Sequence, residues 1–157
     1  MTLEGLNEDF RDLLVLLVDA GVEFVIVGAY ALAFHGAPRA SGDIDLFVRP
    51  SRANASRGFS ALARFGAPLE AAGLTAADFA RPGTVYQIGL PPRRVDVLTE
   101  ISGLTFDEAW ASRVTAEVAG RTVSFIGRAA LLRNKEATGR VKDAADAARL
   151  RQIKPAP

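Results

Sequence analysis

Apolar side chains recur along this chain with two periods, and each period predicts one kind of element. From Leu6 to Val18 they are spaced three and four residues apart, which predicts a helix that Asn7 caps and Gly21 ends. Short apolar runs rich in β-branched residues predict strands at residues 22–27 and 43–48. Further strands are expected at 84–88, 93–98 and 122–126. Further helices are expected at 29–35, 52–65, 106–114, 129–137 and 141–153, with one or two short helices within 67–83.

A helix, then strands interleaved with helices, then two closing helices predict an α/β fold with a mixed sheet flanked by helices. The chain has 157 residues, of which 49% are hydrophobic and 24% charged. This composition is that of a globular protein with an ordinary hydrophobic core. We therefore expect residues 1–157 to form one domain.

The charge and the residue types exclude several classes of site. The formal net charge is +1, so no strong overall field indicates a nucleic-acid binder. The chain has no cysteine and one histidine, which excludes disulfides, thiolate metal sites and zinc sites built on several imidazoles. No signal-peptide pattern and no apolar run of membrane-spanning length occur, so we expect a soluble, cytoplasmic protein without a membrane partner.

Two acids interrupt the apolar strand at 43–48. Residues two apart on a strand point the same way, so Asp43 and Asp45 are expected to share a face about 7 Å apart along the strand, with Ile44 and Leu46 facing the core. Such a pair repels itself and prefers oxygen-binding cations such as Mg²⁺. Asp-x-Asp pairs are also common at strand ends, and the interpretation as a metal site depends on the neighbouring features.

Two of those features support a metal–phosphate site. Gly28 ends the preceding strand, where the missing side chain lets backbone amides approach a phosphate. On the strand at 93–98, Val95 and Val97 alternate with Arg94 and Asp96, which predicts that Asp96 joins the two acids in a cluster of three carboxylates.

The combined pattern resembles the nucleotidyltransferase fold, which includes the polymerase β-like enzymes. It consists of an apolar strand ending in Gly28, a short helix, Asp43-Ile44-Asp45-Leu46 about fifteen residues after the glycine, and Asp96 on a later strand. Two further segments, Gly28-Ala29-Tyr30-Ala31 with His35-Gly36-x-Pro38-Arg39, and Lys135-Glu136-x-x-x-Arg140-x-Lys142-Asp143-x-x-Asp146, are similar to AbiEii-like toxin nucleotidyltransferases and their relatives. The resemblance extends from about Val22 to Leu150.

This resemblance implies a metal-dependent transfer of a nucleoside monophosphate from a nucleoside triphosphate to a hydroxyl group. Asp43 and Asp45 would hold Mg²⁺ or Mn²⁺, and Asp96 would complete a second metal site or deprotonate the acceptor. Lys135 and Lys142 would neutralise the triphosphate. Many members of the fold carry serine or a second glycine after the strand, whereas this chain has Ala29, so any phosphate contact at that position comes from the backbone.

Several residues keep two interpretations. Arg39 either clamps phosphate or pairs with Asp43 or Asp45, and Ser41 either supplies the hydroxyl that Ala29 lacks or forms a turn. Arg94 either reaches the substrate or pairs with Asp96. His35 is more typical of a packed residue than of a catalyst, although it could line the site. Tyr30 and Gln87 are candidates for a base pocket, Arg140 and Asp143 for a structural pair, and Leu104 and Trp110 for the core.

The resemblance leaves two functions open. The chain is either an active nucleotidyltransferase, such as the toxin of a bacterial toxin–antitoxin pair that modifies an RNA or a protein, or a catalytically weak or inert relative that acts by binding, as a partner or antitoxin component. Transfer of a labelled nucleotide to an acceptor would distinguish the two functions. An antitoxin or a second copy of the chain could supply the surface that selects the acceptor.

Overall fold

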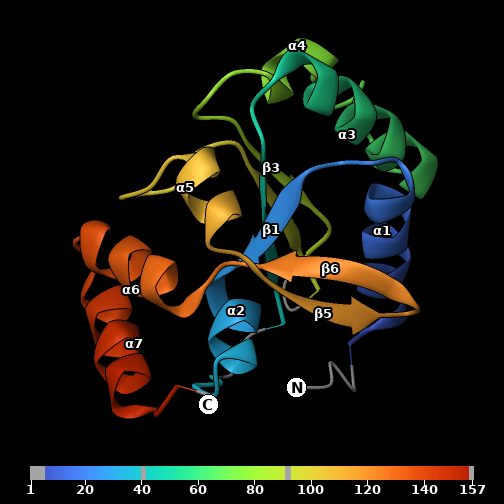
Figure 1. The fold of residues 1–157 in the computed structure, drawn as a ribbon. Coiled ribbons are helices and arrows are strands. Elements are labelled where there is room, and N and C mark those ends of the chain that lie inside the picture. The colour runs from blue at the N-terminus through green and yellow to red at the C-terminus, as the bar shows by residue number, and fades with distance from the viewer. Residues whose placement is uncertain (1–5, 40–41, 91–92, 156–157) are drawn as a thin grey trace.

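A computed structural model describes residues 6–39, 42–90 and 93–155, and it contains an α/β fold built on one mixed sheet (Figure 1). The six strands lie in the order β3-β4-β2-β1-β6-β5. Their bounds are β1 Phe24–Val27, β2 Ile44–Val48, β3 Val85–Ile88, β4 Val95–Leu98, β5 Val114–Val118 and β6 Arg121–Phe125. β1 is antiparallel to β2 and parallel to β6, β2 is parallel to β4, and the outer strands β3 and β5 are antiparallel to their neighbours.

Helices cover both faces of the sheet, which is why the central strands are almost entirely apolar. Their bounds are α1 Glu8–Asp19, α2 Gly28–Phe34, α3 Arg52–Phe65, α4 Ala76–Phe79, α5 Phe106–Ala111, α6 Arg128–Ala137 and α7 Val141–Gln152. One hydrophobic cluster joins α1, α3 and α4 to one face through Ile44 and Leu46. The other joins α2, α5, α6 and α7 to the opposite face through Val27 and Phe47. Figure 1 shows α6 and α7 on the side of the sheet away from α1.

Local side chains set the helix boundaries. The Asn7 side chain accepts a hydrogen bond from the Phe10 amide at 2.9 Å, which caps α1 as predicted. Ser51 begins α3, and Gly66 ends it in the left-handed region with a φ of 98°. Within the described part of the chain, no helix is long and apolar enough to cross a membrane.

The segment after Phe106 differs from the prediction of one helix over 106–114. The helix α5 ends at Ala111, and residues 114–118 form the strand β5, which was not predicted. Val114, Ala116 and Val118 do alternate with Thr115 and Glu117, but most of β5 is exposed because it is an edge strand. A tight turn through Ala119 and Gly120, with φ values of 51° and 77°, returns the chain into β6.

Candidate active site

The sheet brings two of the predicted carboxylates side by side. Asp45 on β2 and Asp96 on β4 are partners in the parallel register of these strands, which places their Cα atoms at the spacing of neighbouring strands, about 4.8 Å. Asp43 lies immediately before β2, two residues from Asp45. The alternation in the sequence predicted one face for Asp45 and Asp96, and the strand register has them as neighbours.

Asp45 is partly buried and faces the negative charge of its neighbours. Burial is the largest of the effects that raise its pKa from 3.8 to about 6, and the charge of Asp96, a hydrogen bond between the two carboxyl groups and the charge of Asp43 act in the same direction. The positive charge of Lys135 opposes this rise. A carboxyl group with this pKa marks a place where one more positive charge would be stabilising.

Gly28 lies directly beneath the Asp45 carboxylate. A Cβ atom at position 28 would lie 2.0 Å from Asp45 Oδ2 and 3.0 Å from its Cγ. The backbone of Gly28 also has a φ of +68°, which favours glycine. Sequence reasoning assigned this glycine to phosphate approach. The structure gives it a second role, which is to leave room for a carboxylate.

Arg94 lies between Asp43 and Asp96. Its Nε donates to Asp96 Oδ1 at 2.7 Å and its Nη2 to Asp96 Oδ2 at 3.2 Å. The same Nη2 is 3.4 Å from Asp43 Oδ2, and the Arg94 amide donates to Asp43 Oδ1 at 3.1 Å. Of the two interpretations of Arg94, the structure shows the ion pair with Asp96. Asp43 is a second partner that was not predicted.

A buried cation, Lys135 of α6, lies near the acids on the neighbouring helices. Its side chain is 7% exposed, and its Nζ lies 3.2 Å from Asp143 Oδ1 and 3.4 Å from Asp146 Oδ2, both on α7. Burial raises the pKa of Asp143, but hydrogen bonds from Thr138 and Lys135 and the charges of Lys135 and Arg140 outweigh burial and hold that pKa below 3.8. The two helices thus fix Lys135 in one position beside Asp45.

Of two arginines with predicted ion pairs, Arg39 has a different partner and Arg140 has the expected one. Arg39 was expected on phosphate or on Asp43 or Asp45, but its Nε lies 3.3 Å from Asp146 Oδ2. The ion pair forms because α7 packs beside the segment that follows α2, where Arg149 also donates to the Pro38 carbonyl at 2.6 Å. Arg140 does pair with Asp143, at 2.8 Å from Nε to Oδ2, but its side chain is exposed and the pair lies within the N-terminal turn of α7.

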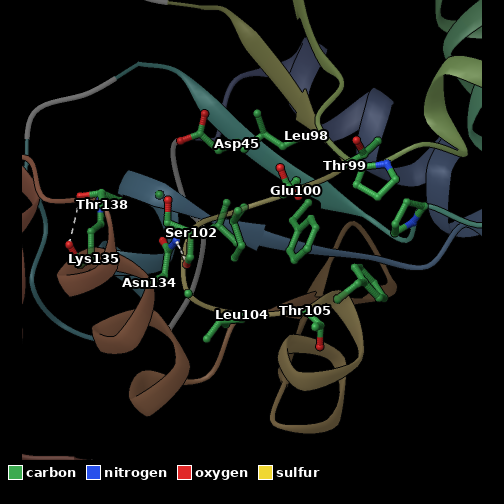
Figure 2. A pocket seen from close by; sticks show the side chains of 18 of the residues that line it. Asp45, Leu98, Thr99, Glu100, Ser102, Leu104, Thr105, Asn134, Lys135 and Thr138 are labelled. Carbon is green, nitrogen blue, oxygen red and sulfur yellow. Dashed lines mark hydrogen bonds between the residues drawn. The ribbon is translucent and has the colours of Figure 1, made fainter.

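An open cleft of about 780 Å³ adjoins Asp45 and Gly28. Figure 2 shows the segment from Leu98 to Thr105 along this cleft, with Asn134, Lys135 and Thr138 of α6 nearby. Asn134 donates to the Ser102 carbonyl at 2.9 Å and so ties α6 to this segment. The volume is that of a site for a small molecule or a nucleotide.

The remaining candidates lie around this site or apart from it. Ala29 is buried, and Ser41 lies outside the described residues. Lys142 is exposed on α7 and is not among the residues that line the cleft. His35 is 2.8 Å from the Ile126 carbonyl through Nε2 and stacks edge-on against Phe34, which agrees with a packed residue.

The candidates for a base pocket and for the core also differ in how close to the site, or how buried, they are. Burial raises the pKa of Tyr30, and the charge of Asp43 raises it further, so the tyrosine lies near the acids. Gln87 is exposed and is the register partner of Asp96 on the outer strand β3. Leu104 is buried as expected, whereas Trp110 is only partly buried and carries the Arg113 guanidinium 3.8 Å from its ring centre.

The donor set at this site fits a hard divalent cation. Asp45 and Asp96 supply carboxylate oxygens side by side, and burial together with the charge of Asp96 raises the pKa of Asp45. Across the described ranges, no three acidic or imidazole side chains are already arranged to hold a metal ion together. Arg94 forms ion pairs with two of the acids, Asp43 and Asp96.

Comparisons with known proteins identify the fold. No family model matches the chain, and no curated protein is similar to it in sequence. Among solved structures, the lincosamide antibiotic adenylyltransferase LnuA with lincomycin bound is similar with a TM-score of 0.60 and 12% identity, over 94% of this chain and 98% of that one. A Thermotoga maritima protein provisionally classified as a nucleotidyltransferase is similar with a TM-score of 0.54 and 16% identity, over 91% and 88%. The chain therefore has the nucleotidyltransferase fold.

Sequence reasoning missed some residues of the site. Thr138 and Asn134 line the cleft and were not predicted, because hydroxyl and amide side chains on a helix carry no periodic signal. Arg49 lines the other end of the cleft, where it pairs with Glu23 at 3.2 Å and with Asp107. Its position directly after β2, on the same face as Asp45 and Phe47, was a signal that could have found it.

Proposed function

We propose that this chain is a metal-dependent nucleotidyltransferase, which moves a nucleoside monophosphate from a nucleoside triphosphate to a hydroxyl group. The observation that carries the proposal is the register of Asp45 with Asp96 beside an open cleft, where the missing side chain of Gly28 leaves room for the Asp45 carboxylate. These features occur in a chain with the nucleotidyltransferase fold. The oxygen of the acceptor hydroxyl would bond to the α-phosphorus, the bond to the β-phosphate would break, and pyrophosphate would leave.

The acids would hold Mg²⁺ or Mn²⁺ through Asp45, Asp96 and Asp43. When bound, the metal would stabilise negative charge on the phosphates as a Lewis acid. Asp96 would complete the metal site or accept the proton of the acceptor hydroxyl. Because the Asp45 carboxyl is raised to a pKa of about 6, the pair holds less charge in the absence of a cation than it would with one.

Lys135 and the backbone near Gly28 would contact the triphosphate, and the lysine would neutralise part of its charge. Lys135 is fixed by Asp143 and Asp146 and lowers the pKa of Asp45, so its charge reaches the acids. The backbone at Gly28 and Ala29 would contribute amide contacts. Arg39, Ser41 and Lys142 stay candidates from the family resemblance, of which Arg39 is paired with Asp146.

The family resemblance suggests that the acceptor hydroxyl belongs to an RNA or a protein and that the chain is the toxin of a toxin–antitoxin pair acting in the cytoplasm. An antitoxin or a second copy would then complete a minimal domain formed by residues 1–157. The similar structure LnuA is a lincosamide adenylyltransferase, so a small-molecule hydroxyl is included among the acceptors to be tested.

A second candidate function is that of a weak or inert relative that acts as a binding partner. Two features favour it. Arg94 pairs with two of the three acids, and Ala29 replaces the hydroxyl that many relatives have after the strand. A protein of this kind would bind a nucleotide, or another protein, without transferring a phosphoryl group.

Transfer of label separates these functions. Each α-labelled nucleoside triphosphate would be incubated with Mg²⁺ or Mn²⁺ and with total RNA, cell lysate or lincomycin. We expect transfer to one acceptor class, reduced by about 10²-fold or more in Asp45→Asn because the metal contributes several kcal/mol to the transition state.

The matched control is Asp107→Asn, an acid at the rim of the same cleft whose side chain is 81% exposed and pairs with Arg49. It should retain transfer. The absence of labelled product with every acceptor, together with the absence of calorimetric Mg²⁺–nucleotide binding, would refute the enzyme. Nucleotide binding without transfer would favour the inert relative.

A further inference from the structure

Arg94 lies where a metal ion would need to bind. Its guanidinium contacts both carboxylate oxygens of Asp96, at 2.7 and 3.2 Å, and one oxygen of Asp43, at 3.4 Å. The other oxygen of Asp43 accepts the Arg94 amide at 3.1 Å. Two of the three acids thus already have positively charged partners.

The charges of this group explain why the arginine is there. Asp43, Asp45 and Asp96 carry up to three negative charges within two strands, and such a cluster is unfavourable without a cation. An arginine does not lose its proton at accessible pH, so it can leave these acids only by moving. The Arg94 side chain is 28% exposed and precedes the first residue of β4, so one side of it borders solvent.

We propose that Arg94 is an internal counter-ion that a divalent metal must displace from Asp43 and Asp96, after which its guanidinium contacts the phosphates of the nucleotide. The displacement by a metal is inferred from the contacts of Arg94 alone. The later contact with the phosphates rests on the proposed function. Arg94 is thereby a positioning residue in the metal-free protein and a substrate contact in the loaded one.

Two observations agree with a displaceable arginine. The Arg94 guanidinium is shared between two carboxylates, those of Asp43 and Asp96, and is held by neither alone. The Asp45 carboxyl group hydrogen-bonds to Asp96, whereas the ion pairs of Arg94 are with Asp43 and Asp96. Metal binding would therefore begin at the Asp45–Asp96 pair and proceed by removing the guanidinium from Asp96.

Calorimetric binding of Mn²⁺ and Mg²⁺, without nucleotide or acceptor, tests the displacement. We expect Arg94→Gln to bind Mn²⁺ about tenfold more tightly than the unmodified chain, because a charge-assisted contact no longer competes for the acids. Arg94→Lys keeps the charge without the paired hydrogen bonds and should fall between the two. Arg93→Gln, at the exposed neighbouring arginine, is the matched control and should not change the affinity.

Equal or weaker Mn²⁺ binding by Arg94→Gln would overturn the proposal, since it would mean that Arg94 prepares the acids for the metal. Circular dichroism establishes whether each variant is folded. If Arg94→Gln does not fold, the Nε–H nuclear magnetic resonance signal of Arg94 in the unmodified chain, assigned by its loss in Arg94→Lys, replaces it. A signal that does not move on saturation with Mg²⁺ would equally overturn the displacement.

The second half is tested by the nucleotide. If the guanidinium contacts the phosphates, Arg94→Gln should raise the KM for nucleoside triphosphate about tenfold while its Mn²⁺ affinity rises. An unchanged KM would overturn this part alone. Because metal affinity is measured without transfer, an inactive chain can still support the displacement, and an active transferase can still refute it.

Discussion

The substitution Gly28→Ala tests whether the end of β1 is shaped for a carboxylate. A Cβ atom there would lie 2.0 Å from Asp45 Oδ2, and ordinary contact begins near 3.4 Å, so the carboxylate must move by about 1 Å or more. Displacements of that size in a catalytic group reduce rates by about 10²-fold. The positive φ of +68° also strains the backbone of the alanine variant, which lowers the free energy of unfolding by about 1–2 kcal/mol.

Gly73→Ala separates these two effects. Gly73 has a φ of +71°, nearly that of Gly28, and a Cβ atom there would meet nothing within 4 Å. Both variants should therefore lose about 1–2 kcal/mol of stability from the backbone, measured by urea unfolding. Only Gly28→Ala should also lose Mn²⁺ affinity, measured by calorimetry, and nucleotidyl transfer.

Two outcomes would refute this reasoning. If Gly28→Ala binds Mn²⁺ as tightly as the unmodified chain, the Asp45 carboxylate has room to move without consequence. If Gly73→Ala loses transfer to the same extent, the effect arises from general destabilisation and not from the contact with Asp45. A selective loss of nucleotide binding with normal metal affinity would instead return Gly28 to the phosphate role that the sequence indicated.

Two further predictions concern the buried charges. Because the pKa of Asp45 is raised from 3.8 to about 6, its ionised form destabilises the fold, and this loss should develop as the pH rises from about 4 through 6, reaching at most about 3 kcal/mol. In urea unfolding with chelator, Asp45→Asn should therefore exceed the unmodified chain in stability at pH 8 but not at pH 4, and a less stable variant at pH 8 would contradict the pKa shift. Lys135→Met should lower the free energy of unfolding by about 3–5 kcal/mol, because it leaves Asp143 and Asp146 buried without their lysine. The control Lys142→Met, on the exposed side of α7, should change it by about 0.5 kcal/mol or less, and equal effects of the two substitutions would refute a structural role for the buried lysine.

The sequence predicted the elements that have a buried face and a clear boundary. α3 spans Arg52–Phe65 as expected, because Ser51 and Gly66 mark both ends. β2 and β4 were found through their apolar residues. β5 was not predicted, because residues 114–118 form an exposed edge strand whose alternation is weak, and the helix expected over 106–114 included its first residue. Hydrophobic periodicity reflects which side chains are buried, so a mostly exposed edge strand shows only a weak periodic pattern.

The same physical difference explains which parts of the site were predicted. The alternation on a strand has a period of two and cannot slip without exposing the core, so Asp45 and Asp96 could be placed on one face from sequence alone. The partners of long cationic side chains depend instead on how helices are placed in space. Arg39 lies only a few residues before Asp43, yet its ion pair is with Asp146, more than a hundred residues later. No local pattern contains that information.

This contrast bears on the assignment of function. The acids of the site are specified by strand register and can be recognised in a chain whose similarity to known structures is 12–16% identity. The cations that decide whether those acids hold a metal are Arg94 and Lys135, and their partners depend on tertiary packing. Arg94 forms ion pairs with two of the carboxylates, whereas Lys135 forms its ion pairs with Asp143 and Asp146 of α7 and acts on Asp45 through its charge. Under the proposed function, whether the chain transfers nucleotides therefore depends less on the three aspartates than on whether Arg94 leaves them when a metal ion binds.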